Sequence, residues 1–370
     1  MLRDYMGVIV LNEDESNIRS LTLNRPLASI PIFGRYRVID FVLSNMVNAG
    51  LTNVGIFVET NSRSLVDHIG TGKPWDLNRK IDGLYIFNHT LRGMIHDDIK
   101  VFKNNMEYFY RSRKEKVILA RSRMIMNINL EKVAQFHEES GADVTIVSKR
   151  VKNSDMYTNC DILNLDENGK VLSVGRNIGL DNEMNVSAEV FIMSKEFFIQ
   201  AVYSCMQEGT CSSVMEYVYK NVQKHDIRAY EFEGYLGCIN SVSSYYKVSM
   251  DFLNYEIMRE LCGRNGNIYT KSYDSPPTKY LNGANVSNSI MASGSIVKGM
   301  VTNSIVSRRV IIEEGAEIID SIIFSRCTIG KNVKLKNVIL DKNVIIEDDK
   351  VLIGDNKYPI VIEKGSRIEL

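Results

Sequence analysis

The sequence predicts an α/β domain followed by a parallel β-helix built from hexapeptide repeats. Up to residue 250, short apolar runs alternate with segments in which apolar residues recur at helical spacing. Beyond residue 285, small or β-branched residues recur every five or six positions, a period that neither a helix nor an alternating strand has. A polar, turn-rich stretch lies between the two patterns. We therefore expect an α/β domain at 1–250, a linker with a helix at 251–285 and a β-helix domain at 286–370.

Four short apolar runs are predicted strands of the first domain. They occupy residues 8–11 (VIVL), 53–58 (NVGIFV), 116–120 (KVILA) and 143–148 (DVTIVS). Continuous apolar runs of this length are typical of strands that are buried in the centre of a sheet. The core of the first domain should therefore be built around them.

Two amphipathic helices are predicted between these strands. The first has apolar residues at helical spacing: Ile39, Val42, Leu43, Met46 and Val47. Gly50 follows it and is a natural residue to end a helix. The second helix covers residues 129–138 (NLEKVAQFHE). Because strands and helices alternate, we expect parallel pairing and a layered α/β domain.

The C-terminal repeat indicates a hexapeptide solenoid. Its inward positions are Val310, Ala316, Ile322, Cys327, Val333, Val338 and Val344, with spacings of 6, 6, 5, 6, 5 and 6. Glycines and asparagines fall between them, for example at Gly315 and Asn332. An ordinary β-rich domain is the alternative, but the pattern persists over consecutive repeats, which favours the solenoid. Since a solenoid leaves its ends open, we expect it to dock on its own α/β domain, on another subunit, or on both.

The linker combines a helix with an extended stretch. Apolar residues at helical spacing predict a helix over residues 252–261. The following segment, GRNGNIYTKSYDSPPTKYLNG, is polar and rich in turn residues. Pro276 and Pro277 disfavour a helix there, so this part should be extended.

Composition narrows the class of protein. The chain has 45 basic and 45 acidic residues, which argues against a nucleic-acid or membrane-surface binder. Six scattered cysteines without a C-x-x-C pair argue against a disulfide framework and a zinc site. The N-terminus lacks a signal-peptide apolar region, and no apolar run approaches the ~18 residues of a spanning helix. We therefore expect a cytoplasmic protein.

Several motifs resemble the ADP-glucose pyrophosphorylase (glucose-1-phosphate adenylyltransferase) family. They are PIFGRYRVIDFVLSNMVNAG (31–50), HIGTGKPWDLNR (68–79), FHEESGADVTI (136–146) and SRRVIIEEGAEIIDSIIFSRCTIG (307–330). The resemblance covers nearly the whole chain and is specific at these segments. It implies a Rossmann-like nucleotidyltransferase (GT-A-type) domain followed by a left-handed β-helix. It is strongest to the non-catalytic paralogue that accompanies a catalytic subunit in glycogen biosynthesis.

The family's reaction defines which groups to look for. Glucose 1-phosphate attacks the α-phosphorus of ATP and displaces pyrophosphate. This chemistry needs a cradle for the triphosphate, a cation for the sugar phosphate, and carboxylates that hold Mg²⁺. In the catalytic family, the cradle is a Gly-Gly-x-Gly-x-Arg-Leu loop after the first strand. Here that loop reads Asn12-Glu13-Asp14-Glu15-Ser16, whose acids and missing glycines oppose phosphate binding.

The other catalytic positions are also altered. The resemblance places Leu27 at the family's lysine when no gap is allowed, although a gap near Arg25-Pro26 would realign it. It places Ser122 at the first metal aspartate, or Arg123 when counted back from His137, Cys238 at the second, and Asn177 at the sugar-phosphate lysine. A thiol and a hydroxyl are poor Mg²⁺ ligands beside a carboxylate. We therefore expect no catalytic residues, no metal site and no cofactor. The alternative is an active adenylyltransferase with relocated ligands, such as Asp97 and Asp98.

One basic segment keeps the family character. In catalytic relatives, basic residues of this stretch line a cleft between the two domains where phosphorylated effectors act. Arginine suits that task because its guanidinium binds phosphate in a bidentate way. We expect an effector or subunit-contact surface formed by Arg25, Arg35 and Arg37, with Lys334 and Lys336 of the solenoid. Ordinary ion pairs are the alternative interpretation.

The sequence thus predicts a catalytically degenerate, regulatory subunit of ADP-glucose pyrophosphorylase. It would join a catalytic homologue in a hetero-oligomer, as a hetero-tetramer, and respond to a phosphorylated effector. Two alternatives stay open at this point. The chain could itself be an active glucose-1-phosphate adenylyltransferase, or it could be a stand-alone sugar-phosphate sensor.

Overall fold

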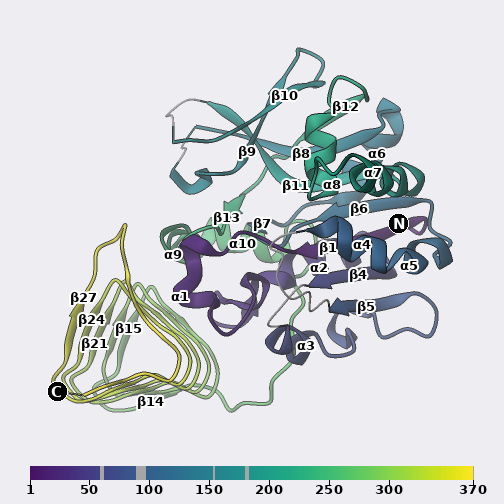
Figure 1. The fold of residues 1–370 in the computed structure, drawn as a ribbon. Coiled ribbons are helices and arrows are strands. Elements are labelled where there is room, and N and C mark those ends of the chain that lie inside the picture. The colour runs from purple at the N-terminus through teal and green to yellow at the C-terminus, as the bar shows by residue number, and fades with distance from the viewer. Residues whose placement is uncertain (59–61, 89–96, 153–154, 180–182, 370) are drawn as a thin grey trace. The chain divides into compact units, whose positions relative to one another are not determined.

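The computed structural model describes residues 1–58, 62–88, 97–152, 155–179 and 183–369 (Figure 1). The chain forms two compact units that interleave along the sequence. Unit 1 comprises Met1–Asp14, Ile39–Cys238 and Glu260–Tyr269, and unit 2 comprises Glu15–Val38, Ile239–Arg259 and the chain from Thr270 onward. The predicted domains at 1–250, 251–285 and 286–370 follow one another along the chain, whereas each compact unit combines several segments. The predicted division into these three domains stays a prediction.

Unit 1 contains the predicted parallel strands at the centre of a mixed sheet. Its consecutive neighbours are β6 (Lys116–Ala120), β1 (Tyr5–Leu11), β4 (Asn53–Val58) and β5 (Gly83–Asn88), all paired in parallel. All residues of β1 and β4 are buried, as continuous apolar runs predict. The parallel pairing expected from the strand–helix alternation is therefore confirmed for this half of the sheet.

The other half of the sheet is antiparallel, and here the expected parallel pairing is wrong. The long strand β11 (Met184–Ser194) runs antiparallel to β6, to β8 (Val144–Val151) and to β9 (Asp161–Leu165). In addition, β10 (Val171–Arg176) is antiparallel to β9, while β12 (Ile227–Glu231) is parallel to β8. The physical reason is that β11 lies between the predicted strands β6 and β8, so these two never pair directly.

Helices pack on both sides of this sheet (Figure 1). They are α2 (Val38–Asn48), α3 (Arg63–Ile69), α4 (Asp98–Asn104), α5 (Met106–Arg111), α6 (Leu130–Ser140), α7 (Lys195–Glu208) and α8 (Val214–Lys220). One more helix, α10 (Tyr255–Gly263), begins in unit 2 and ends in unit 1. The helices predicted at 39–47 and 129–138 are confirmed as α2 and α6. Asn129 caps α6, because its side-chain oxygen accepts hydrogen bonds from the backbone N–H groups of Glu131 and Lys132.

Unit 2 is dominated by the predicted β-helix, whose coils are triangular in cross-section (Figure 1). One sheet contains β14 (Lys279–Tyr280), β17 (Ile296–Val297), β20 (Ile311–Ile312), β23 (Thr328–Ile329), β26 (Ile345–Ile346) and β29 (Arg367–Ile368). The second contains β15 (Asn285–Ser287), β18 (Met300–Thr302), β21 (Glu317–Ile319), β24 (Lys334–Lys336) and β27 (Val351–Ile353). The third contains β16 (Ile290–Met291), β19 (Ile305–Val306), β22 (Ile322–Ile323), β25 (Val338–Leu340) and β28 (Ile360–Ile362). All seven predicted inward residues are buried, which confirms the solenoid.

The corners of the coils explain the regularly placed asparagines. Asn288, Asn303, Asp320 and Asn337 occupy one corner and all have positive φ angles. Asparagine and aspartate tolerate this left-handed conformation better than other residues with side chains. Their side chains also bond from coil to coil: Asn288 Nδ2 donates to Asn303 Oδ1 at 2.8 Å. A second corner places Arg309, Arg326 and Asn343 one above another, again with positive φ.

Two segments outside the solenoid sequence belong to unit 2 because they pack on its coils. Tyr246 of α9 (Val242–Asp251) donates from its hydroxyl to Asp320 O at 2.7 Å and to Asn337 Oδ1 at 3.0 Å. Phe252 stacks on Phe33 of the segment 15–38, with ring centroids 3.8 Å apart. The predicted linker helix at 252–261 corresponds to α10, which begins three residues later.

Shorter elements complete both units. Unit 1 also contains β7 (Met124–Ile125), β13 (Gly237–Cys238) and η4 (Asp155–Tyr157). Unit 2 also contains η1 (Ser16–Ile18), α1 (Arg19–Thr22), η2 (Leu27–Ser29), β2 (Pro31–Ile32) and β3 (Tyr36–Arg37). Pairing of β13 with β7 places Cys238 opposite Met124, next to the loop that follows β6. This pairing brings two altered catalytic positions, Ser122 and Cys238, into the same region of unit 1.

Candidate functional site

The candidate nucleotide site lies where the parallel strands of unit 1 end. In sheets of this kind, ligands bind at the carboxyl ends of the strands. Asn12 and Glu13 follow β1, and Arg121, Ser122 and Arg123 follow β6. Because β1 and β6 are parallel neighbours, these two loops meet at one edge of the sheet. Any residual nucleotide or metal binding should therefore involve them.

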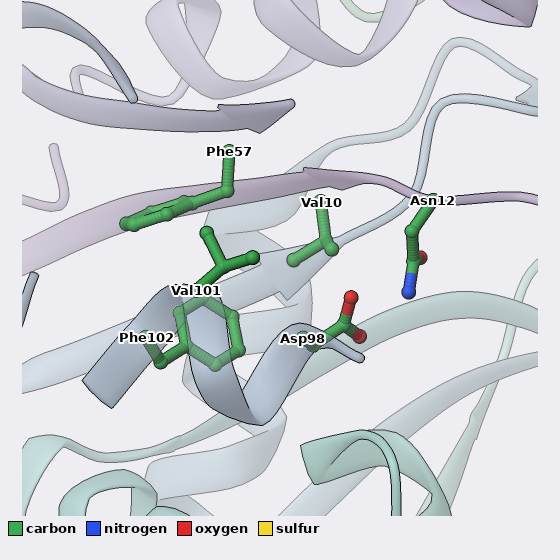
Figure 2. Close-up of a pocket in the computed structure, with 6 residues that line it drawn as sticks. All are labelled: Val10, Asn12, Phe57, Asp98, Val101 and Phe102. Carbon is green, nitrogen blue, oxygen red and sulfur yellow. The ribbon is translucent and has the colours of Figure 1, made fainter. Parts of the chain in front are cut away.

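A hollow at this edge is filled by the protein itself. It is lined by Val10, Asn12, Phe57, Asp98, Val101 and Phe102. Figure 2 shows Asp98 of α4 and Asn12 turned toward the same space, with the phenyl rings and the valines closing the rest. These side chains leave no room for a water molecule between them. A nucleobase or phosphate could enter only if these side chains moved.

Asp97 and Asp98, the relocated metal ligands of the alternative hypothesis, lie at the start of α4. Asp97 caps α4: its carboxylate accepts a hydrogen bond from Lys100 N at 3.2 Å and pairs with Lys100 Nζ at 2.9 Å. Asp98 is 4% exposed and faces the filled hollow. Among the described residues, no three His, Cys, Asp or Glu side chains gather in a way that could hold a metal ion.

Glu13 of the acidic loop turns inward and accepts hydrogen bonds from Ser122, the residue that the resemblance places at the first metal aspartate. Its Oε1 accepts hydrogen bonds from both the backbone N–H and the hydroxyl of Ser122, each at 2.8 Å. Ser122 is fully buried and Glu13 nearly so. The carboxylate of Glu13 therefore serves the protein's own backbone. In unit 2, the carboxylate of Glu15 likewise accepts from Leu27 N at 2.6 Å, and Leu27 is fully buried.

Arg123 is held in a buried ion cluster. Its Nε donates to Glu189 Oε2 at 2.9 Å, and its Nη2 pairs with Glu189 Oε1. Arg121 approaches the same carboxylate, with Nη1 3.8 Å from Oε1. Burial by itself would raise the pKa of Glu189, but the charges of Arg123 and Arg121 lower it below its ordinary value. Glu189 is therefore a carboxylate at neutral pH, and it neutralises the guanidinium groups of Arg123 and Arg121.

The backbone around Glu189 is unusual. Its φ angle is +55°, which is rare for a residue with a side chain. The β11–β8 register shifts between Ser187 and Phe191, so Glu189 lies in a bulge of β11. Sequence reasoning missed this residue, because nothing in the local pattern indicates which of the strand's side chains faces the arginines.

The last two altered positions are also occupied by internal contacts. Asn177 donates from Nδ2 to Tyr157 O at 3.0 Å and from its backbone N to Cys160 O at 2.9 Å. Cys238 lies with its sulfur 3.3 Å from that of Cys160. Asn177 is 1% exposed and both cysteines are fully buried. All four positions Leu27, Ser122, Asn177 and Cys238 thus serve the protein interior.

The predicted effector residue Arg25 lies in a second cluster, within unit 2. It is 3% exposed, and its Nη2 contacts both carboxylate oxygens of Asp341, at 2.7 Å and 2.5 Å. The guanidinium also lies over the ring of Phe324, 6.0 Å from its centroid. Its Nη1 is buried and has no hydrogen-bond partner among the described residues. A buried donor of this kind is costly unless a ligand or water satisfies it.

Lys342 is the lysine that joins Arg25 and Arg37 in this cluster. Burial, together with the charges of Arg37, Arg25 and Lys364, lowers its pKa to about 7, and the charge of Asp341 opposes this shift. Asp341 pairs with Arg25, while the charges of Arg25, Arg37 and Lys364 all act on Lys342. Such an arrangement suits an added anion, whose charge would favour the protonated lysine. We name Arg25, Arg37, Asp341, Lys342 and Lys364 the cation cluster.

The remaining predicted effector residues lie elsewhere on unit 2. Arg35 is exposed and stacks on Tyr36, and its carbonyl accepts from Arg308 Nη2 at 3.4 Å. Lys334 and Lys336 are exposed on β24, where Lys334 pairs with Glu317 at 3.2 Å. Their part in an effector surface stays a prediction. The sequence analysis did not identify Lys342 and Lys364 as candidate anion-binding residues. The coil repeat offered a signal for them, because each directly precedes a corner residue with a positive φ angle.

Comparisons with known proteins agree with this architecture. Residues 16–174 match the Nucleotidyl transferase family, and residues 276–358 match the GlmU-like, C-terminal hexapeptide family. None of the described helices combines the length and the apolar character that a bilayer crossing needs.

Similar proteins cover nearly the whole chain. The glycogen biosynthesis protein GlgD of Bacillus subtilis is 32% identical, covering 97% of this chain and 96% of its own. That of Geobacillus stearothermophilus is 33% identical, covering 85% and 83%. A glucose-1-phosphate adenylyltransferase of Bacillus mycoides is 28% identical over 91% of both chains. With this identity over both units, the chain belongs to the GlgD group of the ADP-glucose pyrophosphorylase family and thereby to glycogen biosynthesis.

Proposed function

We propose that this chain is a catalytically degenerate, regulatory subunit that supports ADP-glucose formation from ATP and glucose 1-phosphate by a catalytic partner. The observation that carries the proposal is the internal satisfaction of the altered catalytic positions. Ser122 binds Glu13, Arg123 binds Glu189, and Cys238 contacts Cys160. Each group that would have to hold Mg²⁺ or phosphate is already engaged and buried. The partner is a catalytic homologue in a hetero-oligomer, by analogy with the family.

The energetic argument favours a binding or regulatory role over catalysis. Mg²⁺ stabilises the developing charge in phosphoryl and nucleotidyl transfer by several kcal/mol, which corresponds to a rate factor on the order of 10³. Ser122 and Cys238 cannot supply the anionic oxygen ligands that Mg²⁺ prefers. Restoring a carboxylate at residue 122 alone would also fail, since it would face the carboxylate of Glu13 at hydrogen-bond distance.

The first prediction concerns activity. Pyrophosphate release from ATP and glucose 1-phosphate by the purified chain should be lower than that of the catalytic homologue by at least about 10³-fold. A mixed complex should form when both chains are co-expressed, and its activity should differ from that of the homologue alone. The measurements are size-exclusion chromatography and a coupled pyrophosphate assay.

A catalytically inactive homologue supplies the control for this prediction. In a complex with a catalytic homologue whose metal aspartates are changed to alanine, no turnover should remain. If that complex makes ADP-glucose, this chain is the catalyst and the active-enzyme alternative holds. If no mixed complex forms but the chain binds a sugar phosphate, the stand-alone sensor is the better description.

The regulatory part of the proposal rests on the cation cluster. Arg25, Arg37 and Lys342 would bind the phosphate group of an effector, with the Nη1 of Arg25 as a buried donor. Lys342 is charged below a pH of about 7 and neutral above it, because burial and neighbouring cations lower its pKa. A bound dianion would favour the charged lysine, so binding should be coupled to proton uptake.

This coupling gives a second prediction, made with sulfate because it stays a dianion throughout the neutral range. Sulfate affinity of the wild-type chain, measured by calorimetry, should fall by roughly tenfold as pH rises from about 6 to about 8.5. In Lys342→Arg, which stays charged, affinity should persist and the pH dependence should vanish. In Lys342→Met, binding should be weak at every pH.

The result that would contradict this assignment is a slope that survives in Lys342→Arg. Lys298→Met is the matched control, because Lys298 is a solenoid lysine paired with Glu313 and is not one of the predicted effector residues. It should leave sulfate binding unchanged.

Arg37→Ala should reduce effector response of the mixed complex, and an unchanged response would remove Arg37 from the effector site.

A further inference from the structure

Two cysteines at the altered site are in direct contact. Cys160 lies directly before β9 and Cys238 lies on β13, and their sulfurs are 3.3 Å apart although 78 positions separate them in the sequence. Both residues are fully buried, and neither is part of a disulfide. The proposed regulatory function rests in part on this contact but assigns no chemistry to the two thiols. We therefore considered what chemistry two adjacent thiols support.

The backbone on both sides of the pair is held in place. Tyr157 Oη donates to Leu236 O at 2.5 Å, which ties the segment before Cys160 to the segment before Cys238. Asn177 N donates to Cys160 O at 2.9 Å, and Cys238 pairs with Met124 in the β13–β7 ladder. The two sulfurs thus meet in a defined setting, so a bond between them needs a shift of the side chains and little movement of the chain.

The electrostatic setting of the pair is also defined. The hydrogen bond to Cys238 and burial raise the pKa of the Cys160 thiol, while the charge of Arg123 opposes that rise. Cys160 is therefore a thiol at neutral pH. The charge of Arg123 acts on both thiols, and it would stabilise a thiolate formed transiently on either.

We propose that Cys160 and Cys238 form a dithiol–disulfide redox site that a small, uncharged peroxide oxidises. One thiolate attacks a peroxide oxygen, the O–O bond breaks, and a sulfenic acid and water result after protonation. The second thiol attacks the sulfenic sulfur, the S–S bond forms, and the S–O bond breaks to release a second water. Two electrons pass from the two sulfurs to the peroxide. An external thiol reverses the reaction by exchange.

The structural consequence is a covalent link between the turn 157–160 and β13. Cys238 is the last residue of unit 1 before the chain continues into Ile239 of unit 2. The link would fix the backbone where Cys238 is followed by Ile239. In the reduced chain, noncovalent contacts alone hold this part of the backbone. It would also preserve the contact that closes the altered catalytic region.

The test is peroxide treatment of the folded full-length chain, followed by alkylation of the remaining thiols and peptide mass spectrometry. The background variant carries Cys205→Ser and Cys211→Ser, because these two cysteines also lie near each other. The expected product is one cross-linked peptide joining Cys160 and Cys238, lighter by two hydrogen atoms and restored by dithiothreitol. Its rate of formation should rise with pH, since the raised pKa of Cys160 keeps thiolate scarce at neutrality.

Two comparisons make the result decisive. In the urea-unfolded chain the cross-links should be distributed over several cysteine pairs, whereas in the folded chain the 160–238 link should dominate. Cys238→Ser should abolish it and leave Cys160 open to sulfenic-acid trapping. If the folded chain keeps both thiols at every peroxide dose, or if either cysteine is oxidised only to a sulfinic acid, the pair is a packing contact and the proposal fails.

Discussion

Glu189→Gln is expected to lower the free energy of unfolding of unit 1 by about 3–5 kcal/mol. The change removes the carboxylate that Arg123 and Arg121 share, and it leaves two largely buried guanidinium groups facing a neutral amide. Glutamine has nearly the same shape, so the loss reports on charge and hydrogen bonding and not on a cavity. Urea unfolding followed by circular dichroism would measure it.

The pH dependence of that loss can be stated in advance. The pKa of Glu189 is lowered in the folded protein, so its stabilising contribution is fully present above its unfolded pKa of about 4.3. The contribution is lost as pH falls through the folded value. The difference between wild type and Glu189→Gln should therefore be constant near neutrality and shrink in acid. Glu183→Gln is the control, because the exposed pair of Glu183 with Arg150 should contribute little. A similar loss in both variants would rule out the burial argument.

Arg25→Met is expected to destabilise unit 2 by a comparable amount, about 3–5 kcal/mol. Asp341 would then be a buried carboxylate without its guanidinium partner, since both side chains are less than 5% exposed. The double variant Arg25→Met with Asp341→Asn should recover much of that loss, because it removes the uncompensated charge. A double-mutant cycle in chemical unfolding measures the coupling between the two residues.

These variants separate the effect of Arg25 on anion binding from its effect on the stability of unit 2. Lys334→Met breaks an exposed ion pair on the same solenoid and should change stability little. If the double variant is as unstable as Arg25→Met alone, packing of the arginine side chain on Phe324 matters more than its charge. If the double variant is stable yet binds no sulfate, Arg25 contributes to both the fold and the anion site.

Patterns that repeat at short range made the fold predictable. Each coil of the β-helix buries its own small or β-branched residue, so the five- or six-residue period survives in the sequence. The runs at 53–58 and 116–120 coincide with β4 and β6 because a buried parallel strand needs apolar residues on both faces. The antiparallel half of the sheet was missed, since the position of β11 between β6 and β8 depends on pairing and not on local composition.

The altered catalytic positions could be found by resemblance, but their new partners could not. Glu13 was expected to repel a ligand as part of an acidic loop. In the structure its carboxylate is turned to Ser122, where it satisfies a buried backbone N–H and a hydroxyl. Whether an acidic side chain meets solvent or a buried donor depends on the loop's path, which single-residue properties do not fix.

The sequence by itself determined the α/β domain, the β-helix and the basic character of the segment that contains Arg25, Arg35 and Arg37, while the loss of metal carboxylates stays a prediction from the resemblance. Only the tertiary structure decided which charges meet. Arg25 and Asp341 are 316 positions apart, Glu13 and Ser122 are 109, and Arg123 and Glu189 are 66. Hydrophobic burial acts on each residue and leaves a periodic trace, whereas hydrogen bonds and ion pairs depend on distances of about 3 Å that only the folded chain establishes.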